Sequence, residues 1–186
     1  MTDLATYFRS GPVGTIVIDD GKANVMSLAM LNALHGAFDQ AEKDKTVVIL
    51  KARGKHFSGG FDLNVFAKGS AEDQYLMLKA GAELALRILS FPTPVVAACQ
   101  GNAYPMGAFL IMSGDHRIAA EGDYPADALE RSAEEAAQKL ATLNMAAHAA
   151  TKARARGAVI KMIRDMIDED ITPQYGEDRI ARRASA

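Results

Sequence analysis

Two loops rich in small residues, each following an apolar run, are the clearest candidates in this chain for binding or catalysis. The first, "KHFSGGFDL", contains Gly59 and Gly60, and the second, "QGNAYPMGAF", contains Gly101 and Gly107. Glycines keep side chains out of the way, so the backbone can approach a ligand and present its peptide N–H groups. Two such loops at neighbouring strand ends can aim two N–H groups at one oxygen atom and stabilise negative charge that develops there.

A helix is expected to begin near Gly107, where its first N–H groups lack intrahelical partners and its dipole favours negative charge. Taken singly, the first loop is better explained as a strand-to-helix turn, and the second is also consistent with a packed turn. The first loop is not a phosphate-binding P-loop, because no Gly-Lys-Ser/Thr follows at the required spacing. Ser58 lacks the G-x-S-x-G frame of a nucleophile elbow. A serine hydrolase built on Ser58, detectable with a fluorophosphonate probe, is therefore a distant third hypothesis.

The remaining polar residues favour structural roles. Asp115 and His116 are adjacent, so in a strand they point to opposite faces, and a structural polar pair is favoured over a catalytic dyad. The four histidines show no metal-ligand spacing, so no metal site is predicted. The stretch "KARAR", from Lys152 to Arg156, predicts a solvated basic helix face. Contact with ligand phosphates or a neighbouring subunit is the minor alternative.

The elements that must position the two loops alternate along the chain. Apolar, β-branched runs predict strands at 14–20, 46–52, 94–99 and 116–120. Amphipathic patterns predict helices at 28–44 and 71–90, capped by Ser27 and Ser70. This alternation predicts an α/β domain, in which both loops lie at corresponding strand ends, the usual place for a site.

The character of the chain changes after Tyr124, where helix formers dominate and no further strand is predicted. We expect an incomplete α/β core over residues 1–124. We expect a helical region over residues 125–186 that mediates oligomerisation. Asp127 and Glu130 have the spacing of a capping box. The alanine-rich segment 146–155 indicates close helix packing.

Composition narrows the class of protein further. The 186 residues suffice for one domain with a substantial core, and the net charge of −2 implies no nucleic-acid partner. No apolar run approaches the length of a membrane span. The single cysteine fits a reducing compartment, and the N-terminal segment does not resemble a secretory signal, so we expect a cytoplasmic protein.

Three ordered blocks resemble the crotonase superfamily, the enoyl-CoA hydratase/isomerase family. They are "GKANVMSLAMLNAL", "VVILKARGKHFSGGFDL" and "FPTPVVAACQGNAYPMGAFLIMSGDHRIAA". The resemblance implies an α/β fold, a crotonase-like spiral of β-β-α units followed by C-terminal helices. It also implies an acyl-CoA thioester as ligand and no separate cofactor, since coenzyme A is part of the substrate. Family members commonly assemble as homotrimers or dimers of trimers.

The resemblance also implies roles for individual residues. The backbone N–H groups of Phe61 and Met106 correspond to the family's oxyanion hole, which binds the thioester carbonyl and stabilises the enolate. Asp62 is expected to brace its loop and not to act as a base. The positions expected at the substrate are Lys22, Ala23, Gly60, Asp62, Gly107 and Phe109.

Two residues depart from the family pattern. Pro105 replaces a usual glycine, but Met106 keeps its own N–H, so the second donor survives. Phe109 stands where hydratases carry a glutamate. Adding water across a double bond requires acid–base groups on both reacting atoms, and phenylalanine transfers no proton. An isomerase or lyase is therefore favoured over a standard two-glutamate hydratase.

A third departure concerns length, because the resemblance skips a segment between Tyr124 and Pro125 that normally carries the remaining acid. Two hypotheses stay open. One is an enzyme of the enoyl-CoA hydratase/isomerase type whose further segment is not included in this sequence. The other is a catalytically inactive crotonase-like protein that binds CoA or serves in assembly.

Overall fold

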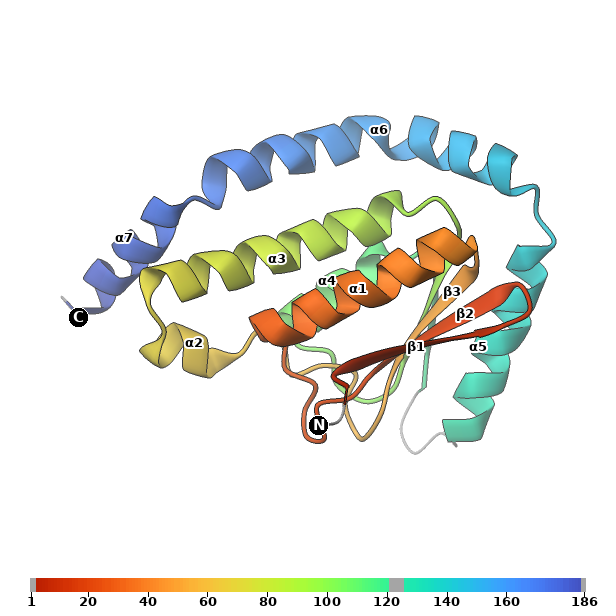
Figure 1. Ribbon diagram of the computed structural model, residues 1–186, viewed down its shortest axis with the longest axis horizontal. Helices are drawn as coiled ribbons and strands as arrows, with labels where there is room; N and C mark the ends of the chain where they lie inside the picture. The colour runs from red at the N-terminus through yellow and green to blue at the C-terminus, as the bar shows by residue number, and fades with distance from the viewer. Residues whose placement is uncertain (1–2, 121–125, 185–186) are drawn as a thin grey trace.

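A five-stranded sheet organises the computed structural model, which describes residues 3–120 and 126–184 (Figure 1). The strands follow their chain order across the sheet, with β1 antiparallel to β2 and the other neighbours parallel. Their bounds are β1 Ala5–Ser10, β2 Val13–Ile18, β3 Val47–Ala52, β4 Val95–Cys99 and β5 His116–Ala119. The four predicted strands are thus present, while β1 was missed because its edge position leaves most of its residues exposed.

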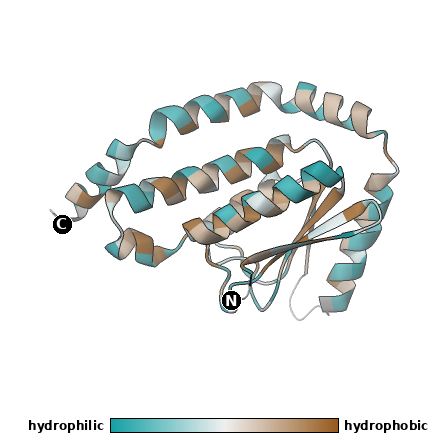
Figure 2. Cartoon of the chain, in the orientation of Figure 1, coloured by the Kyte–Doolittle hydropathy of each residue, from teal (hydrophilic) through white to brown (hydrophobic). Residues whose placement is uncertain are grey.

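Helices cover both faces of the sheet. On one face lie α1 (Leu28–Asp44) and α3 (Ala71–Ser90), and on the other lies α5 (Ala126–Ala141), as Figure 1 shows. Side chains alternate along each strand, so Val48 and Leu50 join the core beneath α1 and α3. Val47 and Ile49 face α5 instead. Figure 2 shows hydrophobic colours along the central strands and mixed colours along the outer helices.

The helix caps behave as their sequences predict. The Ser27 hydroxyl accepts a hydrogen bond from the Met30 N–H, and α1 has the predicted bounds. Ser70 and Asp73 form a reciprocal capping box, and α3 also has the predicted bounds. The six-residue helix α2 (Leu63–Lys68) was not predicted, because it is too short to show a hydrophobic period.

Two further helices, α6 (Met145–Asp170) and α7 (Pro173–Ala184), run back along α3 (Figure 1). The predicted capping box is wrong: Asp127 lies inside α5, and its carboxylate is 3.4 Å from the Arg131 guanidinium. Ala146 and Ala150 of the alanine-rich segment are exposed, so these two residues do not pack closely within this chain. The predicted junction between Tyr124 and Pro125 lies outside the described residues. Among the described helices, none combines the length and apolarity that a membrane span requires.

A nearly buried carboxylate, Asp115, fastens α6 to the core. One Asp115 oxygen accepts from the Val95 N–H at 2.8 Å and from the Lys152 ammonium at 2.7 Å. The Arg156 guanidinium lies 3.1 Å from the other oxygen and also donates to the Leu89 carbonyl. The predicted solvated face is therefore wrong for Lys152 and Arg156. Asp115 is a satisfied structural group, as expected, but its charged partners come from α6.

His148 on α6 adjoins this charged cluster. Burial lowers the pKa of its imidazole, the Asp115 carboxylate raises it, and Lys152 and Arg156 lower it, leaving the net pKa below the ordinary value of 6.5. Its buried Nε2 atom has no hydrogen-bond partner in the part of the chain that the structure describes. The folded state therefore favours neutral His148.

We expect acidification to destabilise the fold through His148. Below about pH 6.5 the unfolded chain protonates this imidazole while the folded chain does not, so the free energy of unfolding falls until the folded pKa is passed. His148→Gln should show a shallower loss between about pH 7 and pH 5, measured by urea unfolding. Matching slopes for the variant and the parent protein would contradict this expectation. His116→Gln, on an exposed β5 position, is the matched control.

Candidate functional site

The loops after β2, β3 and β4 meet at the carboxyl ends of these parallel strands. The Gly59 N–H donates to the Ala23 carbonyl at 2.7 Å, which joins the first two loops. The Tyr104 N–H donates to the Ser58 carbonyl at 2.9 Å, which joins the second and third. The predicted neighbourhood of the two glycine-containing loops is therefore confirmed, and a third loop supports them.

Asn24 is the side chain that holds the first two loops in register. It is only 1% exposed. Its Nδ2 donates to the carbonyls of Arg53 and His56, at 2.9 and 2.8 Å. Its backbone has a φ of 55°, a left-handed conformation that asparagine tolerates better than most residues. One buried amide thus satisfies two carbonyls of the neighbouring loop.

Asp20 shapes the loop that contains Lys22 and Ala23. Its carboxylate accepts from the N–H groups of Lys22, Asn24 and Val25, at 2.7–2.9 Å. Burial raises the pKa of Asp20. The three hydrogen bonds together lower the pKa by more than burial raises it, so the net pKa lies below the ordinary value. The Lys22 side chain is exposed beside this ordered turn.

Ser58 is a structural residue. Its side chain is fully buried, and its hydroxyl donates to the Asn24 carbonyl at 2.8 Å. The same oxygen accepts from the Gly60 N–H at 3.1 Å. Because the hydroxyl is engaged on both sides and shielded from solvent, the serine-hydrolase hypothesis loses its nucleophile.

The first turn of α4 (Pro105–Ser113) presents N–H groups without acceptors. Tyr104 is the N-cap residue but makes no side-chain cap, and Pro105 occupies the start of the helix. Within residues 3–120 and 126–184, no hydrogen-bond acceptor contacts the N–H of Met106, of Gly107 or of Phe61. Unpaired N–H groups at a helix start are ready to receive a negatively polarised oxygen.

Phe61 and Met106 approach each other above α3. A Cβ atom at Gly81 would lie 2.6 Å from the Phe61 ring and 3.2 Å from the Met106 sulfur, so only glycine lets both side chains settle there. A Cβ atom at Gly107 would lie 2.6 Å from the Ser58 Cβ. Glycine at this position therefore allows α4 to start directly against the loop that carries Phe61.

An apolar cavity of about 380 Å³ opens beside these two residues. Three helices and the Phe61 loop line it. Its lining comprises Phe61, Leu78, Ala82, Ala85, Leu86, Leu89, Met106, Phe109, Met112, Ser113, Ile163, Ile167 and Ile171. The only hydroxyl, that of Ser113, donates to the Phe109 carbonyl at 2.8 Å. Among the residues that the structure describes, the lining contains no titratable side chain, so these residues can bind a ligand but cannot themselves carry a proton.

The predicted site residues fall into two groups. Phe61, Met106 and Phe109 line the cavity, with Phe109 half exposed at its edge. The others lie outside the lining: Lys22, Ala23, Gly60, Asp62 and Gly107. The Asp62 carboxylate caps α2 by accepting from the Asn64 N–H at 2.9 Å, which confirms its bracing role. The Gly60 carbonyl accepts from Met26 and holds the loop.

Sequence reasoning missed the cavity walls on α3 and α6. Ala82, Leu86 and Leu89 recur at helical spacing, and so do Ile163 and Ile167. That pattern indicates an apolar face on each helix. It does not reveal that the two faces meet, because α6 is far from α3 in the sequence.

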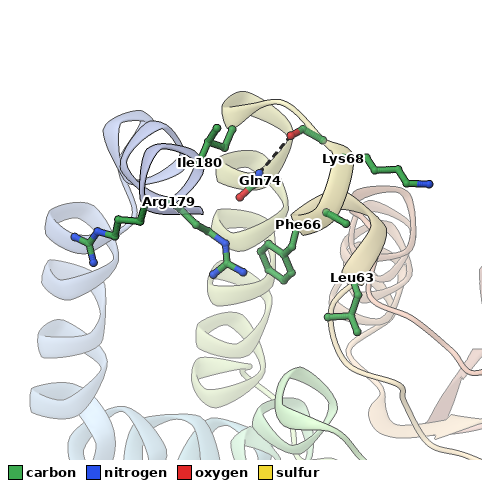
Figure 3. A pocket seen from close by; sticks show the side chains of 9 residues that line it. Leu63, Phe66, Lys68, Gln74, Arg179 and Ile180 are labelled. Atoms are coloured by element: carbon green, nitrogen blue, oxygen red, sulfur yellow. Dashed lines mark hydrogen bonds between the residues drawn. The ribbon is translucent and has the colours of Figure 1, made fainter. Parts of the chain in front are cut away.

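A larger hollow of about 810 Å³ lies between α2, the start of α3 and α7 (Figure 3). The Arg179 guanidinium stacks 4.3 Å from the centre of the Phe66 ring. The Lys68 ammonium points away from this pair (Figure 3). The two labelled cations, Lys68 and Arg179, therefore do not converge on one point (Figure 3). No cluster of three His, Cys, Asp or Glu side chains among the described residues is arranged to bind a metal.

The sheet with its covering helices, and the two loops that meet at the start of α4, define an α/β protein of the crotonase fold. Residues 9–124 match the family model described as enoyl-CoA hydratase/isomerase. The chain therefore belongs to the enoyl-CoA hydratase/isomerase family. The predicted family and fold class, including the C-terminal helices, are confirmed.

Individual relatives share part of the sequence. The "Probable enoyl-CoA hydratase" of Bacillus subtilis (strain 168) is 39% identical over 113 residues, 59% of this chain and 43% of the relative. The carnitinyl-CoA dehydratase of Salmonella enteritidis is 32% identical over 124 residues, 65% of this chain and 47% of the relative. The chain thus spans less than half the length of these curated relatives.

Solved structures match most of the chain. The enoyl-CoA hydratase of Mycobacterium ulcerans Agy99 has a TM-score of 0.85 and 34% identity, covering 95% of this chain and 99% of that chain. The apo enoyl-CoA isomerase of Mtb has a TM-score of 0.83 and 34% identity, covering 90% of this chain and 97% of that chain. These likenesses establish the fold and family, and the residue roles stay predictions.

We expect Asn24→Ala to lower the free energy of unfolding by about 2–4 kcal/mol, because two buried carbonyls lose their donors. Chemical denaturation monitored by circular dichroism measures the change. The exposed Asn102 on a neighbouring loop supplies the control: Asn102→Ala should shift the free energy by less than about 0.5 kcal/mol. Equal effects at the two positions would show that Asn24 does not hold the loops together.

Proposed function

We propose that this chain binds an acyl-CoA thioester and stabilises its enolate through the backbone N–H groups of Phe61 and Met106. One observation carries the proposal: two N–H groups without acceptors in the described chain belong to residues that line one apolar cavity. Membership of the enoyl-CoA hydratase/isomerase family supports the same ligand class. In this proposal the thioester carbonyl lies between the two donors and the acyl chain enters the cavity.

The chemistry follows from charge on the carbonyl oxygen. A thioester α-proton is weakly acidic, and removing it moves negative charge onto that oxygen. Donors already fixed in place stabilise this charge without reorganisation, and losing one typically costs about 10²–10³ in rate. The α4 dipole, positive at the Met106 end, acts in the same direction.

In this proposal, the neighbouring residues contact the CoA or position the backbone of the site. Exposed Lys22 is proposed to pair with a phosphate of CoA, and Ala23 to contact the CoA moiety. Gly60 and Asp62 set the path of the backbone that leads to the Phe61 N–H. Gly107 brings α4 against the same loop. No cofactor besides the CoA of the substrate enters this proposal.

Phe109 bears on the reaction type. It lies at the cavity edge where a hydratase requires a carboxylate, so isomerisation or lyase-type chemistry is favoured over two-carboxylate hydration. Shifting a double bond needs only one group that moves a single proton. The absence of titratable side chains from the cavity lining also favours a second candidate function, a catalytically inactive CoA-binding or assembly protein.

We further propose a cytoplasmic homotrimer or dimer of trimers. The exposed apolar side chains of Val159, Met162 and Met166 recur along α6 and support burial against other subunits.

The donor role of Met106 can be tested without relying on turnover. Carbon-13-edited infrared spectra of bound hexanoyl-CoA should show the thioester carbonyl stretch at lower frequency than in solution, because donors polarise the bond. Met106→Leu keeps the N–H and should preserve the shift. Met106→Pro removes the N–H and should diminish it, with bound fraction and thermal stability checked for each protein.

Two outcomes would contradict the proposal. If hexanoyl-CoA does not bind the parent protein in calorimetry, the proposed ligand is wrong. If the carbonyl frequency of bound hexanoyl-CoA stays unshifted, or is identical in Met106→Leu and Met106→Pro proteins that both bind it, Met106 is not an oxyanion donor.

The reaction type has its own test. With a 3-enoyl-CoA we expect conversion to the conjugated 2-enoyl-CoA, followed by ultraviolet absorbance, and with a 2-enoyl-CoA we expect little water addition. Faster hydration than isomerisation would contradict the role given to Phe109. Binding of both substrates without any turnover would favour the catalytically inactive alternative.

A further inference from the structure

We infer that the apolar cavity beside Met106 selects acyl chains of medium length, roughly eight to ten carbons, whose tails carry no polar substituent. This inference rests on the proposed function, because the thioester carbonyl is taken to lie at the Phe61 and Met106 N–H groups. It adds the class of acyl group and the residues that set its length.

The cavity walls favour a purely aliphatic tail. On α3 the lining residues include Leu78, Ala82 and Leu86, and on α6 they include Ile163 and Ile167. None of these side chains offers a hydrogen bond. A hydroxyl or carboxylate on the acyl tail would therefore lose its water without compensation, whereas an alkyl chain loses nothing.

The one polar group of the lining does not alter this preference. The Ser113 hydroxyl already donates to the Phe109 carbonyl within α4 at 2.8 Å. It is thereby occupied by its own helix, and the cavity presents an apolar surface along its length. Tails carrying polar substituents are disfavoured for the same reason as above.

The length of the cavity sets the preferred chain. Phe61 and Met106 lie against Gly81, with Leu78 of the lining on one side and Ala82 to Leu89 on the other. The acyl chain is taken to run along the longer side, from Gly81 to Leu89. Eight residues of helix correspond to about 12 Å at about 1.5 Å per residue. An extended alkyl chain advances about 1.3 Å per carbon, given bonds of about 1.5 Å, so about nine carbons fill this distance.

Two small residues leave space in the cavity, and Leu89 is the last α3 residue of its lining. Ala82 and Ala85 lie between the donors and Leu89 on the lined face of α3. A larger side chain at either alanine would occupy space that the acyl chain needs. At the far end, the Arg156 guanidinium donates to the Leu89 carbonyl at 2.9 Å, which fixes α6 against α3 there.

The experiment is a calorimetric titration of the full chain with CoA and with acetyl-, butyryl-, hexanoyl-, octanoyl-, decanoyl-, dodecanoyl- and palmitoyl-CoA. We expect affinity to rise about fourfold per methylene buried, from butyryl-CoA to octanoyl- or decanoyl-CoA, and then to stop rising. Hydroxyl substitution near the tail end should abolish most of that gain.

The outcomes separate the inference from the function on which it rests. If no acyl-CoA binds, the proposed function itself fails. If acyl-CoAs bind but acetyl- and decanoyl-CoA differ by less than about threefold, the function stands and the chain-length inference is wrong. A steady rise through palmitoyl-CoA would also overturn the inferred length.

Variants test the cavity directly. Ala85→Leu should weaken decanoyl-CoA binding at least about tenfold and leave butyryl-CoA within about twofold. Ala150→Leu makes the same change at an exposed position of α6 outside the cavity lining, and should alter neither affinity. Equal weakening of both ligands by Ala85→Leu, or an unchanged profile, would overturn the assignment of this cavity.

A second variant tests the same cavity in case Ala85→Leu does not fold. Leu89→Ala removes the far end of the cavity, so the optimum should move toward dodecanoyl-CoA or longer chains. Thermal unfolding of each variant accompanies the titrations. A folded Leu89→Ala protein that retains the parent optimum would show that Leu89 does not set the chain length.

Discussion

The buried amide of Asn24 is the contact on which the site depends. The loop after β2 and the loop after β3 each leave carbonyls away from solvent, and these must find donors. Asn24 supplies two from one side chain, to Arg53 and His56. The backbone carbonyl of Asn24 then accepts a hydrogen bond from the Ser58 hydroxyl. Because these bonds are short and shielded, the backbone that ends at Phe61 is held in one path and can present its N–H in a defined direction.

The start of α4 presents the second set of unpaired backbone N–H groups. A capping side chain often accepts hydrogen bonds from the first N–H groups of a helix. The N-cap residue Tyr104 makes no such bond, and Pro105 has no N–H. The unpaired donors begin at Met106, beside an apolar cavity. In the proposed function, an oxygen that develops negative charge there would meet donors and a helix dipole that are already oriented.

The far wall of that cavity depends on a charged contact some distance from it. Asp115 precedes β5, and it joins Lys152 and Arg156 of α6 to the core in a nearly buried cluster. Such a cluster contributes modest net stability, because desolvation offsets much of the attraction, but it permits few alternative positions of the helix. The resulting placement of α6 brings Ile163 and Ile167 opposite α3 and closes the apolar space.

The sequence by itself determined the elements with strong local signals. Ser27 and Ser70 mark helix starts whose bounds the structure reproduces, and the glycine-containing loops carry the family resemblance. Local patterns could not reveal the burial of Lys152, which a basic stretch predicts to be solvated. They also could not reveal that α3 and α6 enclose a cavity. Capping and periodicity arise between near neighbours in the chain, whereas burial and ion pairing depend on residues that only the tertiary fold brings together.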